Sequence, residues 1–283
     1  MKKYEKFLMA GLPRSGSTLL RSILNQNPTI YSGPISPSVE LLYYTDKYFQ
    51  ESEMLLASPQ PESCYNILSN MMDLFYEPIL KKEGKTKIIE FNRAIPNNIE
   101  RFRTYIKEDI RIVCPVRSIP EILASFISLI HRNSDKVSFV DQYLIDNKIE
   151  VNDDTRCDYL MSDYGIVGQA LFAMSRPFIR GEEGLLKIVE YDDLVERTDD
   201  VMNEIYDFWG LERWSHSYDN LENKYPENDM FQYNLDGMHT VAKTIKKRSK
   251  PPEEVLSKEI IEKYSGMEYW RKDCSNDYYL KIN

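Results

Sequence analysis

The segment from Phe7 to Arg21, FLMAGLPRSGSTLLR, decides the fold of this chain. Its first residues, 7–10, form an apolar run that predicts a strand. Its last residues place leucine and isoleucine at the spacing of a helix that continues to about Asn25. Between strand and helix lies a short turn framed by Gly11 and Gly16. Backbone N–H groups and the positive end of a helix dipole converge at such a turn, which is typical of sites that bind phosphate or sulfate.

The turn has the glycine spacing of a phosphate-binding P-loop but lacks the P-loop lysine. Ser17 follows Gly16 where nucleotide hydrolases and kinases have lysine, and the cation of the turn is Arg14 instead. This arrangement favours one short anionic group bound without a metal over β- and γ-phosphates bound with magnesium. The alternative, from the glycine spacing alone, is an ordinary strand–turn–helix of an α/β protein.

Composition limits the class of protein. The chain has 283 residues, of which 42% are hydrophobic, and a formal net charge of −9. A sizeable core is therefore expected, and a nucleic-acid-binding protein is not. No run of about 18 apolar residues indicates a membrane span, and the apolar stretch after the basic N-terminus is too short for a signal peptide. The cysteines form no CxxC pair, which predicts free thiols, no metal site and a cytoplasmic location; they are Cys64, Cys114, Cys157 and Cys274.

Strands and helices alternate along the chain. This pattern predicts an α/β fold, a P-loop-like central parallel sheet flanked by helices on both faces, in a single domain spanning residues 1–283. Ligands of such folds bind outside the carboxyl ends of the strands. We expect strands at 7–10, 87–91, 110–116 and 185–190, helices at 17–25, 39–56, 62–80, 96–106, 120–130, 159–179, 193–209 and 253–264, and a mostly irregular segment at 219–252 that covers the ligand.

A second motif follows the expected strand at 110–116. Arg117 stands at the carboxyl end of that strand, and Ser125 follows eight residues later, about two turns into the next helix. An arginine and a hydroxyl at the start of a helix are suited to a second phosphate. The alternative is an ordinary surface arginine and a helix serine bonded to its own backbone.

The stretch PRSGST, Pro13–Thr18, resembles the 5′-phosphosulfate loop of sulfotransferases, and is most similar to that of tyrosylprotein sulfotransferases and their bacterial and viral relatives. The resemblance implies 3′-phosphoadenosine 5′-phosphosulfate (PAPS) as sulfuryl donor, 3′-phosphoadenosine 5′-phosphate (PAP) as product, and no metal. It also implies that Arg117 and Ser125 hold the 3′-phosphate, because the family carries an arginine and a serine at this spacing. The residues implied at the 5′ end are Arg14, Ser15, Gly16, Ser17 and Thr18.

Two further residues acquire roles from this resemblance. The relatives have Asn-Lys where this chain has Asn92 and Arg93, and that lysine lies beside the bridging oxygen of the transferred group; Arg93 is expected to act there by its charge alone. Tyr191 corresponds to a tyrosine that approaches the adenosine. The alternative for Arg93 is a solvated arginine near a helix start.

Residues 239–250 contain five cations and no acid, which is unusual in an acidic chain. The relatives close their sites with a loop that ends in Lys-Pro, and Lys250 precedes Pro251. We expect this loop to cover the phosphates, with Lys243, Arg248 and Lys250 as contacts. The alternatives are a solvated loop or a patch for another polyanion.

Transfer to a hydroxyl or amine acceptor requires a general base. The tyrosylprotein branch has a glutamate about 21 residues after the loop arginine, but this chain has Ile35 there. Glu40 is the nearest carboxylate and the first candidate, and His239, whose imidazole titrates near neutrality, is the second. The change leaves protein tyrosine in doubt as acceptor and keeps carbohydrates, lipids and small phenols open.

The sequence thus predicts a PAPS-dependent sulfotransferase. One alternative is a small-molecule kinase with a variant P-loop, which requires magnesium and an aspartate after an apolar strand. The strand at 110–116 ends in Arg117 instead. Another alternative is a nucleotide-binding module that has lost its base. No nucleic-acid partner is expected, and the sequence predicts neither the acceptor nor the oligomeric state.

Overall fold

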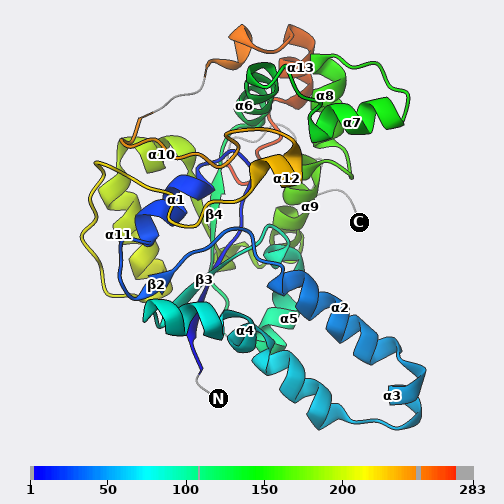
Figure 1. The fold of residues 1–283 in the computed structure, drawn as a ribbon, viewed down its shortest axis with the longest axis vertical. Coiled ribbons are helices and arrows are strands. Elements are labelled where there is room, and N and C mark those ends of the chain that lie inside the picture. Colours follow the sequence, from blue (N-terminus) through cyan, green and yellow to red (C-terminus); the bar gives the residue numbers. More distant parts are fainter. Residues whose placement is uncertain (1–2, 108, 247–249, 272–283) are drawn as a thin grey trace.

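The computed structural model describes residues 3–107, 109–246 and 250–271. These residues form a five-stranded sheet in the order β2-β3-β1-β4-β5, with all strands parallel. Helices cover both faces of the sheet (Figure 1). The α/β class, with its parallel central sheet, is therefore confirmed. The strands are β1 (Glu5–Met9), β2 (Ile30–Tyr31), β3 (Lys87–Phe91), β4 (Ile112–Val116) and β5 (Leu186–Glu190).

Two apolar cores, one on each face of the sheet, follow from the alternation of side chains along the strands. Along β1 and the residue that follows it, Phe7 and Met9 belong to one core, and Leu8 and Ala10 belong to the other. The first core is covered by α1 (Ser17–Leu24), α10 (Tyr191–Glu196) and α11 (Thr198–Trp209). The second is covered mainly by α4 (Pro61–Glu83), α6 (Ile119–Arg132), α8 (Asp153–Met161) and α9 (Ile166–Ile179).

The other elements lie around these layers. A long helical arm, α2 to α4, extends away from the sheet (Figure 1). The figure names α2 (Ser38–Glu51), α3 (Glu53–Ala57), α5 (Ile99–Tyr105), α7 (Phe139–Asp146), α12 (Asp229–Tyr233) and α13 (Lys258–Tyr264); short 3₁₀ turns occupy Ile95–Asn98, Glu183–Leu185 and Pro252–Glu254.

Several predicted elements are wrong in their limits. The single helix predicted at 159–179 is two helices, α8 and α9, because Ser162 ends the first. Its hydroxyl donates to the Tyr159 carbonyl and accepts from the Tyr164 N–H, so local hydrogen bonds replace those of a continuing helix. The predicted helices at 39–56 and 193–209 are also divided, at Ser52 and Arg197.

The two-residue strand β2 was not predicted, and neither were two helices. Helix α7 lies in a polar stretch, and it begins where the Ser138 hydroxyl caps the Asp141 N–H. The segment 219–252, expected to be irregular, contains α12, capped by the Asn228 side chain, and an isolated bridge between Asp219 and Thr244. The two helices and the bridge depend on short caps or pairings rather than on a long apolar pattern.

The parallel sheet gathers the predicted ligand-binding residues. Arg14, Arg93, Arg117 and Tyr191 follow β1, β3, β4 and β5 respectively. Because the strands are parallel, their carboxyl ends meet at one edge of the sheet, and the four residues come together there.

Gly11 is required for the turn after β1. It has a φ of +100°, and a Cβ there would lie 2.3 Å from the Pro115 carbonyl oxygen on β4. We expect Gly11→Ala to lower the free energy of unfolding by about 2–3 kcal/mol. Gly84 also has a positive φ, but nothing lies within 4 Å of an added Cβ, so Gly84→Ala should cost only about 1 kcal/mol. Urea denaturation measures both, and equal losses would contradict the proposed clash.

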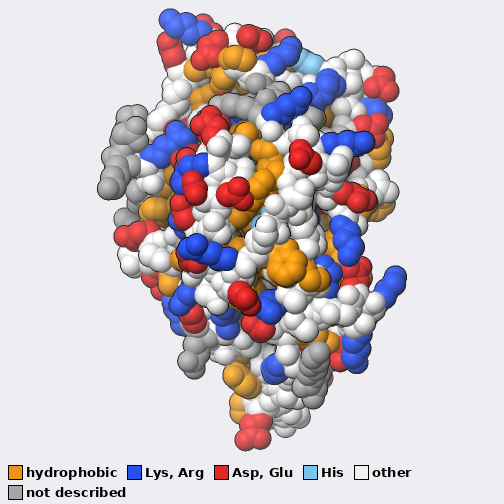
Figure 2. Space-filling model, turned by 90° about the vertical axis from the view of Figure 1, so that its left-hand side faces the viewer, with side chains coloured by type: hydrophobic (Ala, Val, Ile, Leu, Met, Phe, Trp, Pro, Cys, Tyr) orange, Lys and Arg blue, Asp and Glu red, His pale blue; other side chains and the backbone are white. Residues whose placement is uncertain are grey.

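Among the described cysteines, Cys64, Cys114 and Cys157 are free thiols, and Cys274 lies outside the described residues. The described helices include none with the length and apolar character of a membrane span. Figure 2 shows basic and acidic side chains interspersed over one face of the molecule.

Candidate active site

The turn between β1 and α1 is held by β4. The Leu12 N–H donates to the Pro115 carbonyl at 2.9 Å, and the Ser15 hydroxyl donates to the Pro115 carbonyl at 2.8 Å and to the Leu12 carbonyl. Ser15 is fully buried and its side chain does not line the cavity described below. Because the Ser15 hydroxyl donates to backbone carbonyls within the turn, it is not available to a ligand. The backbone amide of Ser15 is the group that could still contact one.

Helix α1 begins at the end of this turn without a side-chain cap. Gly16 is its N-cap in the left-handed region, with a φ of +88°. The first N–H groups of the helix, which include those of Ser17 and Thr18, accordingly have no capping side chain and are suited to an anion. A Cβ at Gly16 would lie 2.9 Å from the Tyr191 ring, so glycine also allows that ring to approach the turn.

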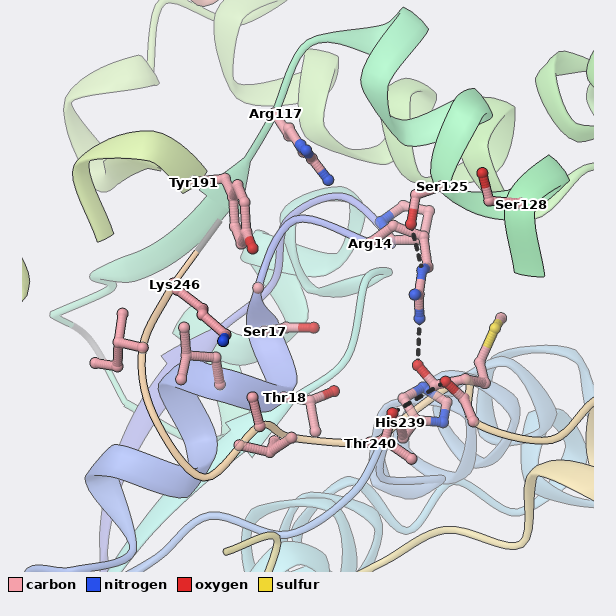
Figure 3. A pocket seen from close by; sticks show the side chains of 18 of the residues that line it. Arg14, Ser17, Thr18, Arg117, Ser125, Ser128, Tyr191, His239, Thr240 and Lys246 are labelled. Atoms are coloured by element: carbon pink, nitrogen blue, oxygen red, sulfur yellow. Dashed lines mark hydrogen bonds between the residues drawn. The ribbon is translucent and has the colours of Figure 1, made fainter. Parts of the chain in front are cut away.

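Arg14 connects the turn to α6. Its Nε donates to the Ser125 hydroxyl at 3.1 Å, and its Nη1 donates to the Met238 carbonyl. Figure 3 shows this guanidinium between Ser125 and the segment that carries His239. Burial, together with the neighbouring cations Arg132 and Arg117, lowers the pKa of Arg14 to about 10. The turn after β1 and Ser125 were predicted to contact opposite ends of one ligand. The hydrogen bond from Arg14 to Ser125 shows that they lie close together, one arginine side chain apart.

Arg117 and Tyr191 lie on the other side of the turn (Figure 3). The Arg117 guanidinium lies over the Tyr191 ring, 4.4 Å from its centre, and donates to Glu121 at 3.3 Å. Such packing fixes the direction of a guanidinium at the end of β4. Tyr191 begins α10, directly after β5.

These residues line one cavity of about 580 Å³. The lining contains one carboxylate, Asp236, which already accepts from Lys136 at 3.0 Å. Among the described residues, six cations line the same cavity: Arg14, Arg93, Arg117, Arg132, Lys246 and Lys250. In an acidic chain, this concentration of positive charge predicts a polyanionic ligand.

Arg93 combines burial with the lack of a hydrogen-bonded or ion-paired partner in the described chain, whereas Arg132, Lys246 and Lys250 are exposed. No hydrogen bond or ion pair engages its guanidinium, its Nε is buried without a partner, and its Cζ lies 5.7 Å from the centre of the Phe91 ring. Burial lowers the pKa of Arg93. A buried guanidinium without a counter-ion is costly, so an anionic group of a ligand is its expected partner.

The lysines of the basic loop, residues 239–250, that line the cavity are not all the ones that were predicted. Lys250 lines the cavity, but Lys243 does not, because its backbone carbonyl accepts from the Leu221 N–H and its side chain is exposed elsewhere. Lys246, which was not predicted, lines the cavity instead (Figure 3). Arg248 lies outside the described residues.

Helix α6 supplies two residues that the sequence analysis missed. Ser125, Ser128 and Arg132 all line the cavity, and their spacing of three and then four residues places them on one face of a helix. This periodicity was visible in the sequence and identifies Ser128 and Arg132 as further candidate contacts.

His239 is held by a carboxylate from α12. Its Nδ1 lies 2.6 Å from Asp229 Oδ1 and 3.4 Å from Glu227 Oε2, and its backbone N–H donates to Asp229 Oδ2. Burial lowers the pKa of His239 below its ordinary value of 6.5, although the two carboxylates act in the opposite direction. The lowered pKa of His239 favours the neutral imidazole, and no described residue bonds to its Nε2. Asp229 and Glu227 were not predicted.

Glu40 lies in a second cavity, of about 870 Å³. The Asn92 amide donates to both oxygens of Glu40, at 3.1 and 3.0 Å. Among the described residues, Arg93 is the one that lines both cavities. Glu40 and His239 thus lie on different sides of Arg93. No group of three or more His, Cys, Asp or Glu within the described chain is arranged to hold a metal.

The comparisons with known proteins identify the family. The model of a family described as the sulfotransferase family matches residues 7–216. The chain therefore belongs to the sulfotransferase family, as the resemblance of the PRSGST turn predicted. The closer likeness to the tyrosylprotein branch stays a prediction. None of the curated proteins matches this sequence.

Solved structures of sulfotransferases are similar over much of the chain. The sulfotransferase domain from the curacin biosynthetic pathway is 15% identical, with a TM-score of 0.45, over 75% of this chain and 76% of that one. The sulfotransferase STF9 from Mycobacterium avium is 14% identical, with a TM-score of 0.45, over 76% and 66%. The sulfotransferase domain of the Synechococcus PCC 7002 olefin synthase is 17% identical, with a TM-score of 0.41, over 92% and 94%.

Proposed function

We propose that this sulfotransferase takes its sulfuryl group from PAPS and transfers it in line to a hydroxyl or amine acceptor. One observation carries the proposal: in an acidic chain, six cations of the described residues and the uncapped start of α1 line one cavity, on which the turn and the Arg117–Ser125 pair converge. A cavity of about 580 Å³ lies within the range of small-molecule sites. The free thiols accord with a cytoplasmic location, which we also propose.

The two ends of the donor have separate sets of contacts. The amides of residues 15–18 and Arg14 hold the 5′ end, while Arg117 and Ser125 hold the 3′-phosphate. Ser125 accepts from Arg14 through its oxygen, so its O–H remains available to donate to a phosphate. The Tyr191 ring, beside both Gly16 and Arg117, contacts the adenosine.

The donor supplies the sulfuryl group: a bond from sulfur to the acceptor oxygen or nitrogen forms as the bond from sulfur to the 5′-phosphate oxygen breaks. Arg93 and Arg14 stabilise the negative charge that develops on the transferred oxygens. His239 accepts the acceptor proton at Nε2, and Asp229 fixes the tautomer that leaves this nitrogen unprotonated. Glu40, which faces the second cavity, is the alternative base.

We expect Arg117→Met to lower the affinity for PAP by about 10- to 100-fold, because a hydrogen bond to a charged group contributes about 1.5–3 kcal/mol. Affinity for adenosine 5′-phosphate, which has no 3′-phosphate, should stay the same. Ser125→Ala should act in the same direction with a smaller effect. Calorimetric titration measures both ligands, and Arg103→Met, at a half-exposed arginine of α5 outside both cavities, is the control. An equal loss for the two nucleotides would contradict the assignment.

Incubation with ³⁵S-labelled PAPS and a panel of alcohols, sugars, phenols and amines tests the function as a whole. Label should enter at least one acceptor without added metal. Phosphoryl transfer from ATP that requires magnesium would identify the chain as a kinase instead. Tight binding of PAP with no transfer to any acceptor would identify a non-catalytic nucleotide-binding module.

A further inference from the structure

The second cavity has a lining of unusual composition. Arg93 also lines the cavity of about 580 Å³ proposed to bind PAPS, which is called the donor cavity below. From Arg93 the second cavity extends between α2, α9 and α12. Under the proposed function, the second cavity holds the acceptor and is called the acceptor cavity, because the sulfuryl group must pass Arg93, the described residue that both cavities share. Because this assignment rests on the proposed function, the kind of acceptor that its lining fits rests on that function too.

One wall of the acceptor cavity is apolar. Ile166, Ala170 and Ala173 on α9 line it at a spacing of four and then three residues, so they lie on one face of the helix. Phe172, whose ring is 39% exposed, and Tyr233 from α12 add aromatic surface. Flat aromatic and small aliphatic surfaces are suited to the C–H face of a ring.

The rest of the lining is rich in side-chain amides: Asn92, Asn97, Gln169 and Gln232. Each amide group carries both hydrogen-bond donors and an acceptor, so it can pair with a hydroxyl in either direction. Asn92 and Gln169 are held in place, since they donate to the Ser36 and Asp163 carbonyls at 2.8 and 3.1 Å. Asn97 and Gln232 have no side-chain hydrogen bond within the described chain.

The charge of the acceptor cavity is opposite to that of the donor cavity. Apart from Arg93 at the junction, its charged residues are the carboxylates Glu40 and Asp163. Within the described chain, no other cation lines it. An acceptor that carried carboxylates or sulfates would face these two like charges, with Arg93 at the junction as the one opposing charge of the described lining.

We infer that the acceptor is a carbohydrate without negative charge. Its hydroxyls pair with the amides, one ring face packs on Phe172 and the small residues of α9, and one hydroxyl is presented at Arg93. A phenol would leave Asn97 and Gln232 without a partner on the ligand, and an acidic peptide would meet Glu40 and Asp163. A volume of about 870 Å³ leaves room for more than one sugar ring.

Labelled PAPS offered separately to neutral oligosaccharides, uronic-acid oligosaccharides and simple phenols tests the inference. We expect transfer to the neutral sugars, with kcat/KM about tenfold or more above that for the other two classes, because phenols lack the hydroxyls that Asn97 and Gln232 would bind and uronic acids bring carboxylates toward Glu40 and Asp163. Preferred transfer to phenols or acidic sugars overturns the inference and leaves the sulfotransferase function intact. Transfer to no class at all, although PAP binds, overturns the proposed function and this inference with it.

Variants of the lining give a second, independent readout. Asn97→Leu and Gln232→Leu should raise KM for neutral sugars about tenfold each, the loss of about one hydrogen bond, without a change in PAP affinity. Asp163→Lys should lower KM for uronic-acid oligosaccharides severalfold. Glu183→Lys, the same change at an exposed acid outside both cavities, should alter neither. If Asp163→Lys and Glu183→Lys behave alike, the charge argument fails.

Discussion

Replacement of Arg93 by methionine should lower kcat of sulfuryl transfer by about 10²–10³-fold, the effect of removing one fixed donor that stabilises transition-state charge. Arg93 lies where the two cavities meet, and no described residue neutralises its guanidinium. The affinity for PAP should change little, because the product carries no sulfuryl group for Arg93 to contact. Rapid-quench measurement of a single turnover, with calorimetry of PAP, separates the two effects.

Arg176 on α9 offers a matched control. Its Nε is also buried without a partner, and its Cζ lies 5.5 Å from the centre of the Phe172 ring. Arg176 itself lines neither cavity. Arg176→Met should therefore leave kcat unchanged, and Arg93→Lys should restore part of the rate, since the charge is retained. A full rate in Arg93→Met would show that Arg93 is only a structural arginine.

Replacement of His239 by glutamine should lower kcat by about 10²–10⁴-fold, the range for loss of a general base. The neutral imidazole is the active form, so activity is lost as pH falls through the pKa of His239. Burial places that pKa below 6.5, which predicts an activity that is constant from neutral pH upward and declines only in acid. The residual activity of His239→Gln should be low and should no longer fall in acid, because glutamine does not titrate.

Asp229→Asn provides a sharper version of the same test. The Asp229 carboxylate raises the pKa of His239 against the effect of burial, so its removal should move the acid decline to lower pH as well as reduce kcat. His131→Gln, at an exposed histidine paired with Asp153, should change nothing. If Glu40→Gln abolishes turnover and His239→Gln does not, the base is Glu40.

Most of the sheet, and the meeting of three arginines at one of its edges, were predictable because they depend on local patterns. The β3 strand was predicted with its observed limits, and the C-terminal end of the helix predicted at 193–209 agrees with that of α11, which Gly210 caps in the left-handed region. The ends of β1, β3 and β4 at one edge then brought Arg14, Arg93 and Arg117 together. Arg132 was also within reach of the sequence, since it shares a helix face with Ser125.

The remainder of the site depends on contacts that no local pattern shows. Asp229 reaches His239 only because α12 forms within a segment that reads as irregular, and Tyr233 from the same helix lines the acceptor cavity. Lys246 replaces Lys243 because the pairing of residues 219–221 with 243–244 determines which side chains face inward. Single short pairings of this kind leave no periodic signal in the sequence.

The central claim is that one cavity binds both charged ends of the same adenylate. Calorimetric titration of the wild-type protein with PAP, without metal, tests this claim most directly when it is compared with adenosine 5′-phosphate and with ATP plus magnesium. We expect PAP to bind at least about 10²-fold tighter than adenosine 5′-phosphate, because the 3′-phosphate adds charge-assisted hydrogen bonds. Equal affinity for the two nucleotides, or a preference for ATP that depends on magnesium, would contradict the claim.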